Sequence, residues 1–241
     1  MTGPGVRATV HAGVAMLARS PFAAGQSGLT SGLDDERASA LRAAILLDTI
    51  DAVLGGGWPL HLFVTPSGDR DALGTLVRRD PALAGRASQV AVHPQVDGDL
   101  GVRMADAAAR TLAAGHDVAL VVRSDVPDVP PNALRAAVAA VAGAATGAAL
   151  AFGPSADGGF YLAATSSAAA LSTAFTDITW SAPDVLASVT ARAQASGCRV
   201  HRVIPWYALD TTDDLAALLA RAAVTGRASR VRRAAVDVQP A

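Results

Sequence analysis

Three aspartates stand beside turn residues in a pattern that could hold a metal ion. Asp125 lies in Ser-Asp-Val-Pro, Asp157 in Ala-Asp-Gly-Gly and Asp210 in Leu-Asp-Thr-Thr, and each follows a short apolar run. If they converge, two carboxylates ~4 Å apart repel each other by about 4 kcal/mol at an effective dielectric constant of ~20. Either one carboxyl then stays protonated or a cation lies between them. Mg²⁺ or Mn²⁺, held by carboxylates and substrate phosphates, is the usual cation in such sites.

Each of these aspartates also has a purely structural explanation. Asp125 could close a turn, and Asp157 with the glycine after it could form a tight turn. Asp210 could be an N-terminal acid of the last predicted helix, although Asp213 and Asp214 suit that role better. A functional interpretation therefore depends on the three loops meeting in space.

The elements that must position these loops alternate along the chain, with short apolar runs between longer alanine-rich segments. The predicted strands are residues 9–18, Leu60–Thr65, Gln89–His93, Val118–Val122, Ala148–Phe152, Phe160–Ala164 and Val200–Ile204. The predicted helices are residues 34–54, Arg70–Arg79, Gly101–Ala114, Asn132–Ala142, Pro183–Ser196 and Thr212–Ala222. This order predicts an α/β fold with three layers (α/β/α) and a mostly parallel, Rossmann-like sheet. Ligands of such open sheets bind beyond the carboxyl ends of the strands, where the three aspartates are expected.

The length of 241 residues suits one large α/β domain. No Pro/Ser-rich linker divides the chain, so residues 1–226 are predicted to form a single domain. The segment 227–241 is rich in Arg and ends close to a Pro, and it is predicted to be a mobile tail.

The composition excludes several classes of function. A formal net charge of −1 removes the usual electrostatic basis for binding nucleic acid. The chain contains no Lys, so chemistry that needs a Lys is excluded, and Cys198 is its only cysteine, which fits a reducing cytoplasm. The apolar run Val10–Ala18 is too short to span a membrane. The five histidines show no spacing typical of a zinc site.

Several short motifs, taken in order, resemble a bacterial glycosyltransferase-A-like family of unknown function, related to the phospholactate guanylyltransferases. The motifs are Gln95 with residues 98–104, and residues 124–127, 153–162, 179–181 and 209–215. The resemblance implies the nucleotide-diphospho-sugar transferase fold and a nucleotide site at the carboxyl edge of the sheet. It also implies Mg²⁺ or Mn²⁺ at Asp125, with Asp210 as the second candidate ligand.

The resemblance further implies a division of roles among the loops. Asp157, Gly158 and Gly159 would shape the side of an unidentified small-molecule acceptor. The donor, a nucleotide or nucleotide sugar, would be held by several loop residues. These donor-side candidates are Arg19, Gly25, Gln26, Ser27, Asp99, Arg103 and Ser124. Glycosyl transfer from a nucleotide sugar is favoured slightly over nucleotidyl transfer.

Two departures from the family pattern bear on function. Members usually read Gly-Ser-Asp-Cys-Pro where this chain has Arg123 and Val126 in place of the Gly and the Cys. Members also tend to carry a basic Lys-Thr-Arg-Leu segment where this chain has Gln-Ser-Gly-Leu at 26–29. Losing a charge-assisted phosphate contact costs roughly 1.5–3 kcal/mol. The alternative prediction is therefore a relative that has lost catalysis and binds a nucleotide weakly or acts through a protein partner.

Overall fold

The chain folds around one twisted sheet of seven strands, in the order β3-β2-β1-β4-β6-β5-β7. The computed structural model describes residues 9–24, 28–144 and 147–236. The strands are β1 (Ala12–Arg19), β2 (Leu60–Thr65), β3 (Val90–Pro94), β4 (Val118–Arg123), β5 (Ala149–Pro154), β6 (Phe160–Thr165) and β7 (Arg199–Arg202). β6 runs antiparallel to β4 and β5, and the remaining pairings are parallel.

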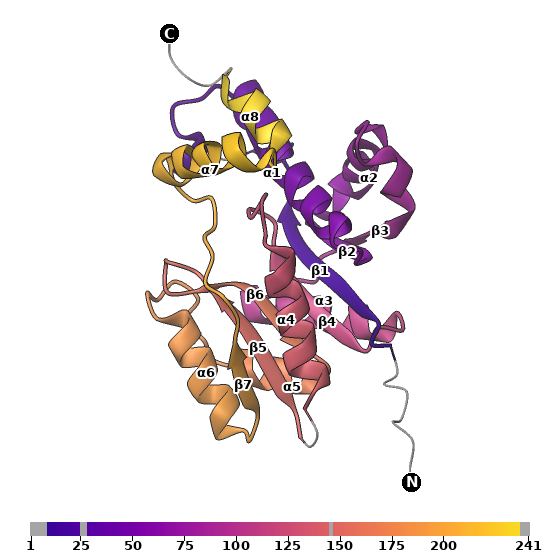
Figure 1. Ribbon diagram of the computed structural model, residues 1–241, viewed down its shortest axis with the longest axis vertical. Coiled ribbons are helices and arrows are strands. Elements are labelled where there is room, and N and C mark those ends of the chain that lie inside the picture. Colours follow the sequence, from indigo (N-terminus) through magenta and orange to yellow (C-terminus); the bar gives the residue numbers. More distant parts are fainter. Residues whose placement is uncertain (1–8, 25–27, 145–146, 237–241) are drawn as a thin grey trace.

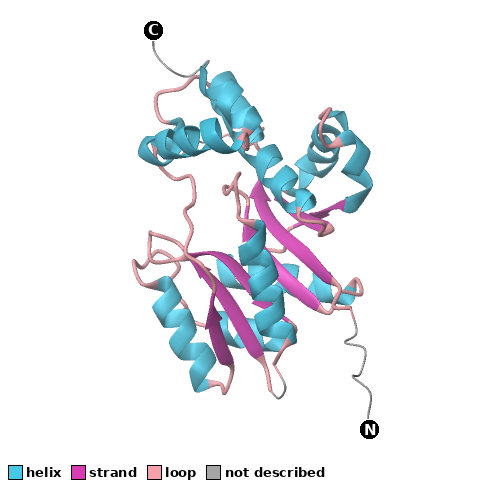
Figure 2. Ribbon diagram, in the orientation of Figure 1, coloured by secondary structure: helices cyan, strands magenta, loops and turns pink. Residues whose placement is uncertain are grey.

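Helices cover both faces of this sheet (Figures 1 and 2). The α-helices of the described residues are α1 (Asp35–Gly55), α2 (Arg70–Arg79), α3 (Leu100–Ala113), α4 (Pro131–Ala142), α5 (Ala168–Phe175), α6 (Val185–Ala195), α7 (Thr212–Thr225) and α8 (Ser229–Val236). Short 3-10 helices are η1 (Gly28–Thr30), η2 (Ser67–Asp69) and η3 (Ala84–Gln89). One apolar core joins α1, α2 and α4 to one face of the sheet, and a second joins α3, α5 and α6 to the other.

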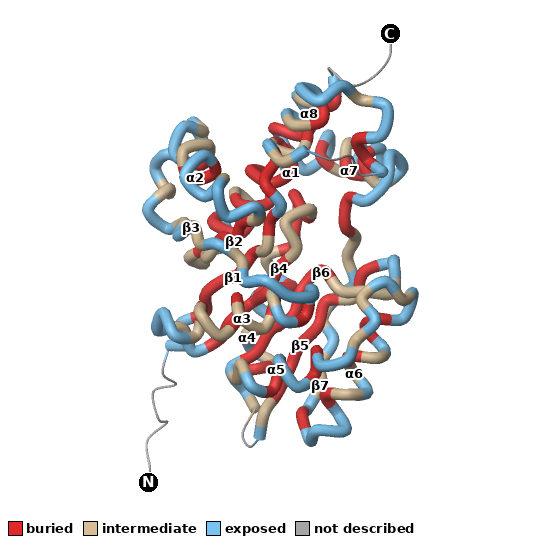
Figure 3. Tube along the Cα trace, turned by 180° about the vertical axis from the view of Figure 1, so that it is seen from behind, coloured by how far each residue is buried: buried red, intermediate tan, exposed pale blue. Residues whose placement is uncertain are grey.

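The predicted three-layer α/β/α fold with a mostly parallel sheet is confirmed. The central strand β4 has the sequence Val-Ala-Leu-Val-Val-Arg, and its first five residues are buried. A strand covered by helices on both faces is apolar throughout, not at alternate positions. Figure 3 shows this burial along the strands and along α1, whereas the loops that surround them are exposed.

Helix α1 is buried on two sides because it lies between the sheet and a third apolar cluster. Its Ile50 packs into the core against the sheet. Its Leu41 and Ile45 belong to the third cluster, together with Leu218 of α7 and Val231 of α8. Helix α8 therefore packs on α1 instead of on the sheet, and α7 joins the same cluster beside α8 (Figure 1).

The C-terminal segment differs from the mobile tail predicted for 227–241. Residues 229–236 form α8, and Arg230 in this helix is only 6% exposed. Its guanidinium nitrogens lie 2.7 Å from an Asp48 oxygen and 2.5 Å from an Asp80 oxygen. The composition suggested a solvated basic tail, but one of its arginines is buried among acids on α1 and beyond α2. Residues 237–241 lie outside the described residues.

Helix α5 is not among the helices predicted from the sequence. Helix α5 has the sequence Ala-Ala-Ala-Leu-Ser-Thr-Ala-Phe and is only eight residues long, too short to show a clear helical period. Its N-cap is Ser167, whose side chain accepts a hydrogen bond from the Ala170 N–H. Within the described residues, no helix is both long enough and apolar enough to cross a membrane.

Candidate active site

The candidate site lies between β1 and β4, where the order in which the chain adds strands to the sheet reverses. These two strands are parallel neighbours, with Leu17 opposite Arg123 at their carboxyl ends. The chain leaves β1 towards β2 on one side and leaves β4 towards β5 on the other. The loops after such a pair diverge, so a crevice forms beyond the strand ends.

The three aspartates singled out in the sequence meet at this crevice, and the guanidinium of Arg123 lies between them. Arg123 Nε and Nη2 donate to the two carboxylate oxygens of Asp125 at 2.9 and 2.7 Å. Arg123 Nη1 donates to Asp157 at 3.2 Å, and Nη2 donates to Asp210 at 3.0 Å. We call these four residues the Arg123 cluster. The expected convergence of the aspartates is therefore present, with an arginine at its centre.

The backbone brings Asp210 to this cluster from a distant part of the chain. The connection from β7 to α7 passes the end of β4, and Figure 1 shows it rising beside the sheet towards α7. The Leu209 N–H donates to the carbonyl of Asp125 at 3.0 Å. The helix after this connection begins with a capping box between Thr211 and Asp214. Asp214 thus performs the helix-capping role, and Asp210 is left to contact Arg123.

A second buried acid, Asp128, anchors the same connection. Asp128 is 5% exposed and accepts hydrogen bonds from Trp206 Nε1 at 3.2 Å and from the Tyr207 hydroxyl. Its other oxygen accepts from Arg221 Nε of α7 at 3.2 Å. These contacts tie the β4–α4 loop to the β7–α7 connection, and so they fix where Asp210 lies.

Asp157 is held by its own turn. Its Oδ1 accepts a hydrogen bond from the Ser155 hydroxyl and another from the Gly159 N–H at 2.9 Å. Gly158 has φ of +81°, and a Cβ there would lie 1.7 Å from the carbonyl oxygen of Pro183. A glycine is therefore required at 158 because the backbone there lies against the segment that precedes α6.

The pKa values of two cluster acids are shifted in opposite directions. Burial raises the pKa of Asp210, and the negative charges of Asp125 and Asp157 raise it further, although Arg123 opposes the shift. Burial also tends to raise the pKa of Asp157, but the hydrogen bonds from Ser155 and its own turn, with the Arg123 charge, lower it overall. Asp210 therefore takes up a proton at higher pH than Asp157 does.

A cavity of about 360 Å³ opens beside the cluster. Arg123, Asp125 and Asp157 lie in its wall, as do Ser124 and Gly159. The remaining wall is mostly apolar and includes Leu17, Leu100, Met104, Phe160, Trp180 and Val185. The cavity can hold a small, partly apolar group with polar atoms directed at the carboxylates.

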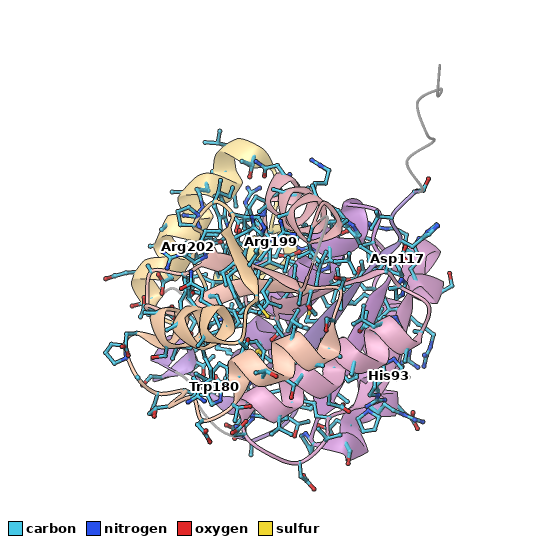
Figure 4. The ribbon with its side chains drawn as sticks, turned by 90° about the horizontal axis from the view of Figure 1, so that it is seen from below. His93, Asp117, Trp180, Arg199 and Arg202 are labelled. Atoms are coloured by element: carbon cyan, nitrogen blue, oxygen red, sulfur yellow. The ribbon has the colours of Figure 1, made fainter. Side chains whose placement is uncertain are left out.

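Trp180 contributes its large indole ring to the wall of this cavity. Its ring packs edge-on against Phe160 and Phe175. Its Nε1 is buried, and none of the described residues accepts a hydrogen bond from it. Figure 4 shows Trp180 well away from His93 and Asp117. This N–H is closed to water in the structure, so it is an unsatisfied buried donor beside the cavity.

Six of the seven predicted donor-side residues have other partners or lie outside the described chain. Asp99 is the N-cap of α3 and accepts from the Val102 N–H at 2.8 Å. Arg103 donates to Gln95 Oε1 at 3.2 Å. Arg19, at the exposed end of β1, donates to the Ala24 carbonyl. Their predicted roles stay predictions, and Gly25, Gln26 and Ser27 lie outside the described residues.

The expected Mg²⁺ or Mn²⁺ does not fit this donor set while Arg123 occupies it. The guanidinium lies within 3.2 Å of an oxygen of each aspartate. A divalent cation ~4 Å from a guanidinium is repelled by about 8 kcal/mol at an effective dielectric constant of ~20. Among the described residues, there is no group of three or more His, Cys, Asp or Glu side chains that could hold a metal ion. A metal at Asp125 and Asp210 stays a prediction.

Three histidines that sequence spacing did not connect lie together on α3's face of the sheet. His61 Nδ1 lies 3.2 Å from His93 Nε2, and His61 Nε2 lies 3.2 Å from His116 Nε2. Burial, followed by the neighbouring His116 and His93 charges, lowers the pKa of His61 to about 4. His61 uses its two ring nitrogens in different directions, so the three rings do not converge on one point. This group is therefore a set of neutral histidines joined by hydrogen bonds.

Comparison with protein families finds one match. The model of a family described as "Uncharacterized protein conserved in bacteria (DUF2064)" matches residues 46–182, which is more than half of the 241 residues. The matched range contains Asp125 and Asp157 and ends before Asp210. None of the curated proteins matches the chain.

Solved structures with the same fold include nucleotide-dependent transferases. A protein of Desulfovibrio desulfuricans G20, assigned as a nucleotide-diphospho-sugar transferase, is 21% identical with a TM-score of 0.68, over 89% of this chain and 88% of that one. A 4-diphosphocytidyl-2C-methyl-D-erythritol synthase is 13% identical with a TM-score of 0.54, over 88% and 98%. The synthase of that name from Anaerococcus prevotii DSM 20548 is 11% identical with a TM-score of 0.50, over 84% and 94%. At these identities the likeness shows the fold.

Proposed function

The chain belongs to the DUF2064 family, and from that premise and the geometry of the site we propose that it is a transferase that uses a nucleotide-activated donor. The observation that carries the proposal is the Arg123 cluster, which gathers three carboxylates around one guanidinium at the switch point of the sheet, beside a cavity lined by Arg123, Asp125 and Asp157. Pockets that combine apolar walls with a few convergent charged groups are the usual form of an active site. The names of the structural neighbours, a nucleotide-diphospho-sugar transferase and diphosphocytidyl synthases, support a nucleotide donor.

The acceptor binds in the cavity beside the cluster. Asp125 and Asp157 line it and can accept hydrogen bonds from acceptor hydroxyls, whereas its apolar wall covers the rest of a small molecule. The donor lies towards the carboxyl end of β1, where Arg19 is exposed and can contact phosphate oxygens.

Glycosyl transfer from a nucleotide sugar is favoured over nucleotidyl transfer. The neighbour assigned as a nucleotide-diphospho-sugar transferase has a TM-score of 0.68, against 0.54 for the diphosphocytidyl synthase. Carboxylates arranged around a small cavity also suit the recognition of sugar hydroxyls, because each ionised carboxylate accepts several hydrogen bonds. Asp125 and Asp157 provide such acceptors here.

One alternative is a family member that binds a nucleotide weakly without catalysis, or acts through a partner protein. Two observations favour it. The cluster's carboxylates are already bonded to Arg123, and the basic segment typical of the family is replaced by Gln-Ser-Gly-Leu at 26–29. The first engages the carboxylates that would hold a metal ion for a diphosphate, and the second removes positive charge that would attract it.

Thermal-shift measurements with a panel of nucleotides and nucleotide sugars, with and without Mn²⁺, separate the two. A ligand at 100 times its Kd stabilises the folded state by roughly 2.7 kcal/mol, so a bound donor raises Tm measurably. We expect one donor class to raise Tm, and expect the rise to shrink in Arg19→Ala, which removes the cation that we place beside the donor phosphates. Arg70→Ala is the control, because it removes an exposed arginine paired only with Asp71. If no donor at roughly millimolar concentration raises Tm, the alternative is supported.

A further inference from the structure

The cation within the Arg123 cluster comes from the chain itself. Every nitrogen of the Arg123 guanidinium donates to an aspartate: Nε to Asp125, Nη1 to Asp157, and Nη2 to Asp125 and Asp210. These bonds are 2.7–3.2 Å long. The bidentate contact with Asp125 is the geometry in which arginine binds a carboxylate most strongly. We propose that Arg123 is the resident cation of this site and keeps Mg²⁺ and Mn²⁺ off Asp125 and Asp210.

The position of the guanidinium is set by rigid parts of the fold. Arg123 is the last residue of β4 and pairs with Leu17 of β1. Asp125 follows two residues later, and its carbonyl accepts the Leu209 N–H. Asp157 is fixed by Ser155 and its own turn. Since three separate segments hold the carboxylates, Arg123 is bound on three sides at once.

Charge explains why a metal and this arginine exclude each other. Three ionised aspartates without Arg123 carry three negative charges in one small region, which a divalent cation would balance. With Arg123 present, the same oxygens are occupied by N–H donors, and a divalent cation would lie beside a fixed positive charge. The carboxylates also raise the pKa of Arg123 above its ordinary value in spite of its burial. The guanidinium therefore keeps its positive charge and does not make room for a metal ion by losing a proton.

Exposure is consistent with a functional position for this arginine. The Arg123 side chain is 31% exposed and lines the cavity, so it is open to a ligand on one side. The buried Arg230 also contacts three aspartates, but its side chain is 6% exposed and does not line the cavity beside Arg123. Arg230 therefore serves as an internal comparison of a structural arginine with similar partners.

Mn²⁺ binding, measured from the electron paramagnetic resonance signal of free Mn²⁺, tests the proposal without any donor or acceptor. The proteins are the wild type, Asp125→Asn, Arg123→Ala, Arg123→Gln and the double variant Arg123→Ala/Asp125→Asn. Arg70→Ala is the control, because it removes an exposed arginine paired only with Asp71. Circular dichroism and thermal melting of each variant establish that it is folded.

We expect no saturable Mn²⁺ binding by the wild type or by Arg70→Ala at roughly millimolar concentration. Arg123→Ala and Arg123→Gln are expected to bind one Mn²⁺ at least about tenfold more tightly, and the double variant to lose that binding. Saturable binding by the wild type that Asp125→Asn removes would overturn the proposal. So would a folded Arg123→Ala and a folded Arg123→Gln that both gain no affinity. The outcome is independent of which donor the protein uses.

Discussion

At the scale of single residues, the site depends on contacts that fix each carboxylate before a ligand arrives. Asp157 is the clearest case, because a hydroxyl, a backbone N–H and the Arg123 guanidinium all bind it. The glycine after it allows the turn, since only a residue without a Cβ can pass so close to Pro183. A group positioned in this way loses little further freedom when it binds a ligand.

Gly158→Ala is expected to destabilise the fold and to weaken ligand binding. Gly197→Ala is the matched control, because Gly197 has φ of +80° and nothing lies within 4 Å of its Cβ position. Both variants strain the backbone, at a cost on the order of 1 kcal/mol. Gly158→Ala must in addition displace Pro183, so we expect it to cost at least roughly 1–3 kcal/mol more. Urea unfolding gives both values, and equal costs would contradict the described packing.

Sequence reasoning found the three aspartates of the site because each follows a strand, and parallel strands end at one edge of a sheet. It did not identify Arg123 as their common partner. The signal was present: Arg123 and Asp125 carry opposite charges only two residues apart, at the end of a strand and in the turn that follows it. The three histidines gave no such signal, because His61 and His93 belong to different strands and His116 to a loop.

At the scale of elements, the site is assembled by the connection between β7 and α7. This segment leaves the sheet, passes the end of β4 and delivers Asp210 before α7 begins. Asp128 holds it through Trp206, Tyr207 and Arg221. Three donors on one buried carboxylate make the segment a fixed part of the site.

Asp128→Asn is expected to lower stability by roughly 2–4 kcal/mol, because a neutral amide cannot accept from all three donors and leaves Arg221 poorly paired. Asp177→Asn is the control, since Asp177 is 79% exposed where it pairs with Arg192. Chemical denaturation measures the loss. An effect no larger than that of Asp177→Asn would show that the segment is held by other contacts.

At the scale of the whole molecule, the last helix fastens the C-terminal part of the chain to α1. Arg230 contacts Asp48, Asp51 and Asp80, and the N–H groups of Arg230 and Val231 both donate to Asp48. The composition of 227–241 predicted a tail because it is basic and polar. Which of several similar arginines is buried depends on acids far away in the sequence, and local composition does not contain that information.

Arg230→Ala is expected to destabilise the protein by about 3–5 kcal/mol, because it leaves the carboxylate of Asp48, 3% exposed, without its charged partner. Arg232→Ala, two residues away on the same helix and exposed, is the control and should change stability by no more than about 0.5 kcal/mol. The free energy of unfolding from urea titration is the measurement. Equal values for the two variants would mean that α8 contributes no specific ion pairs.

The proposed transferase activity requires the ligand to bind at the Arg123 cluster. A crystal structure of the wild-type protein, soaked in chelator with the donor that gives the largest thermal shift, tests this most directly. We predict donor density at the carboxyl ends of β1 and β4, with Arg123 still bonded to Asp125. Donor bound elsewhere on the molecule would contradict the account.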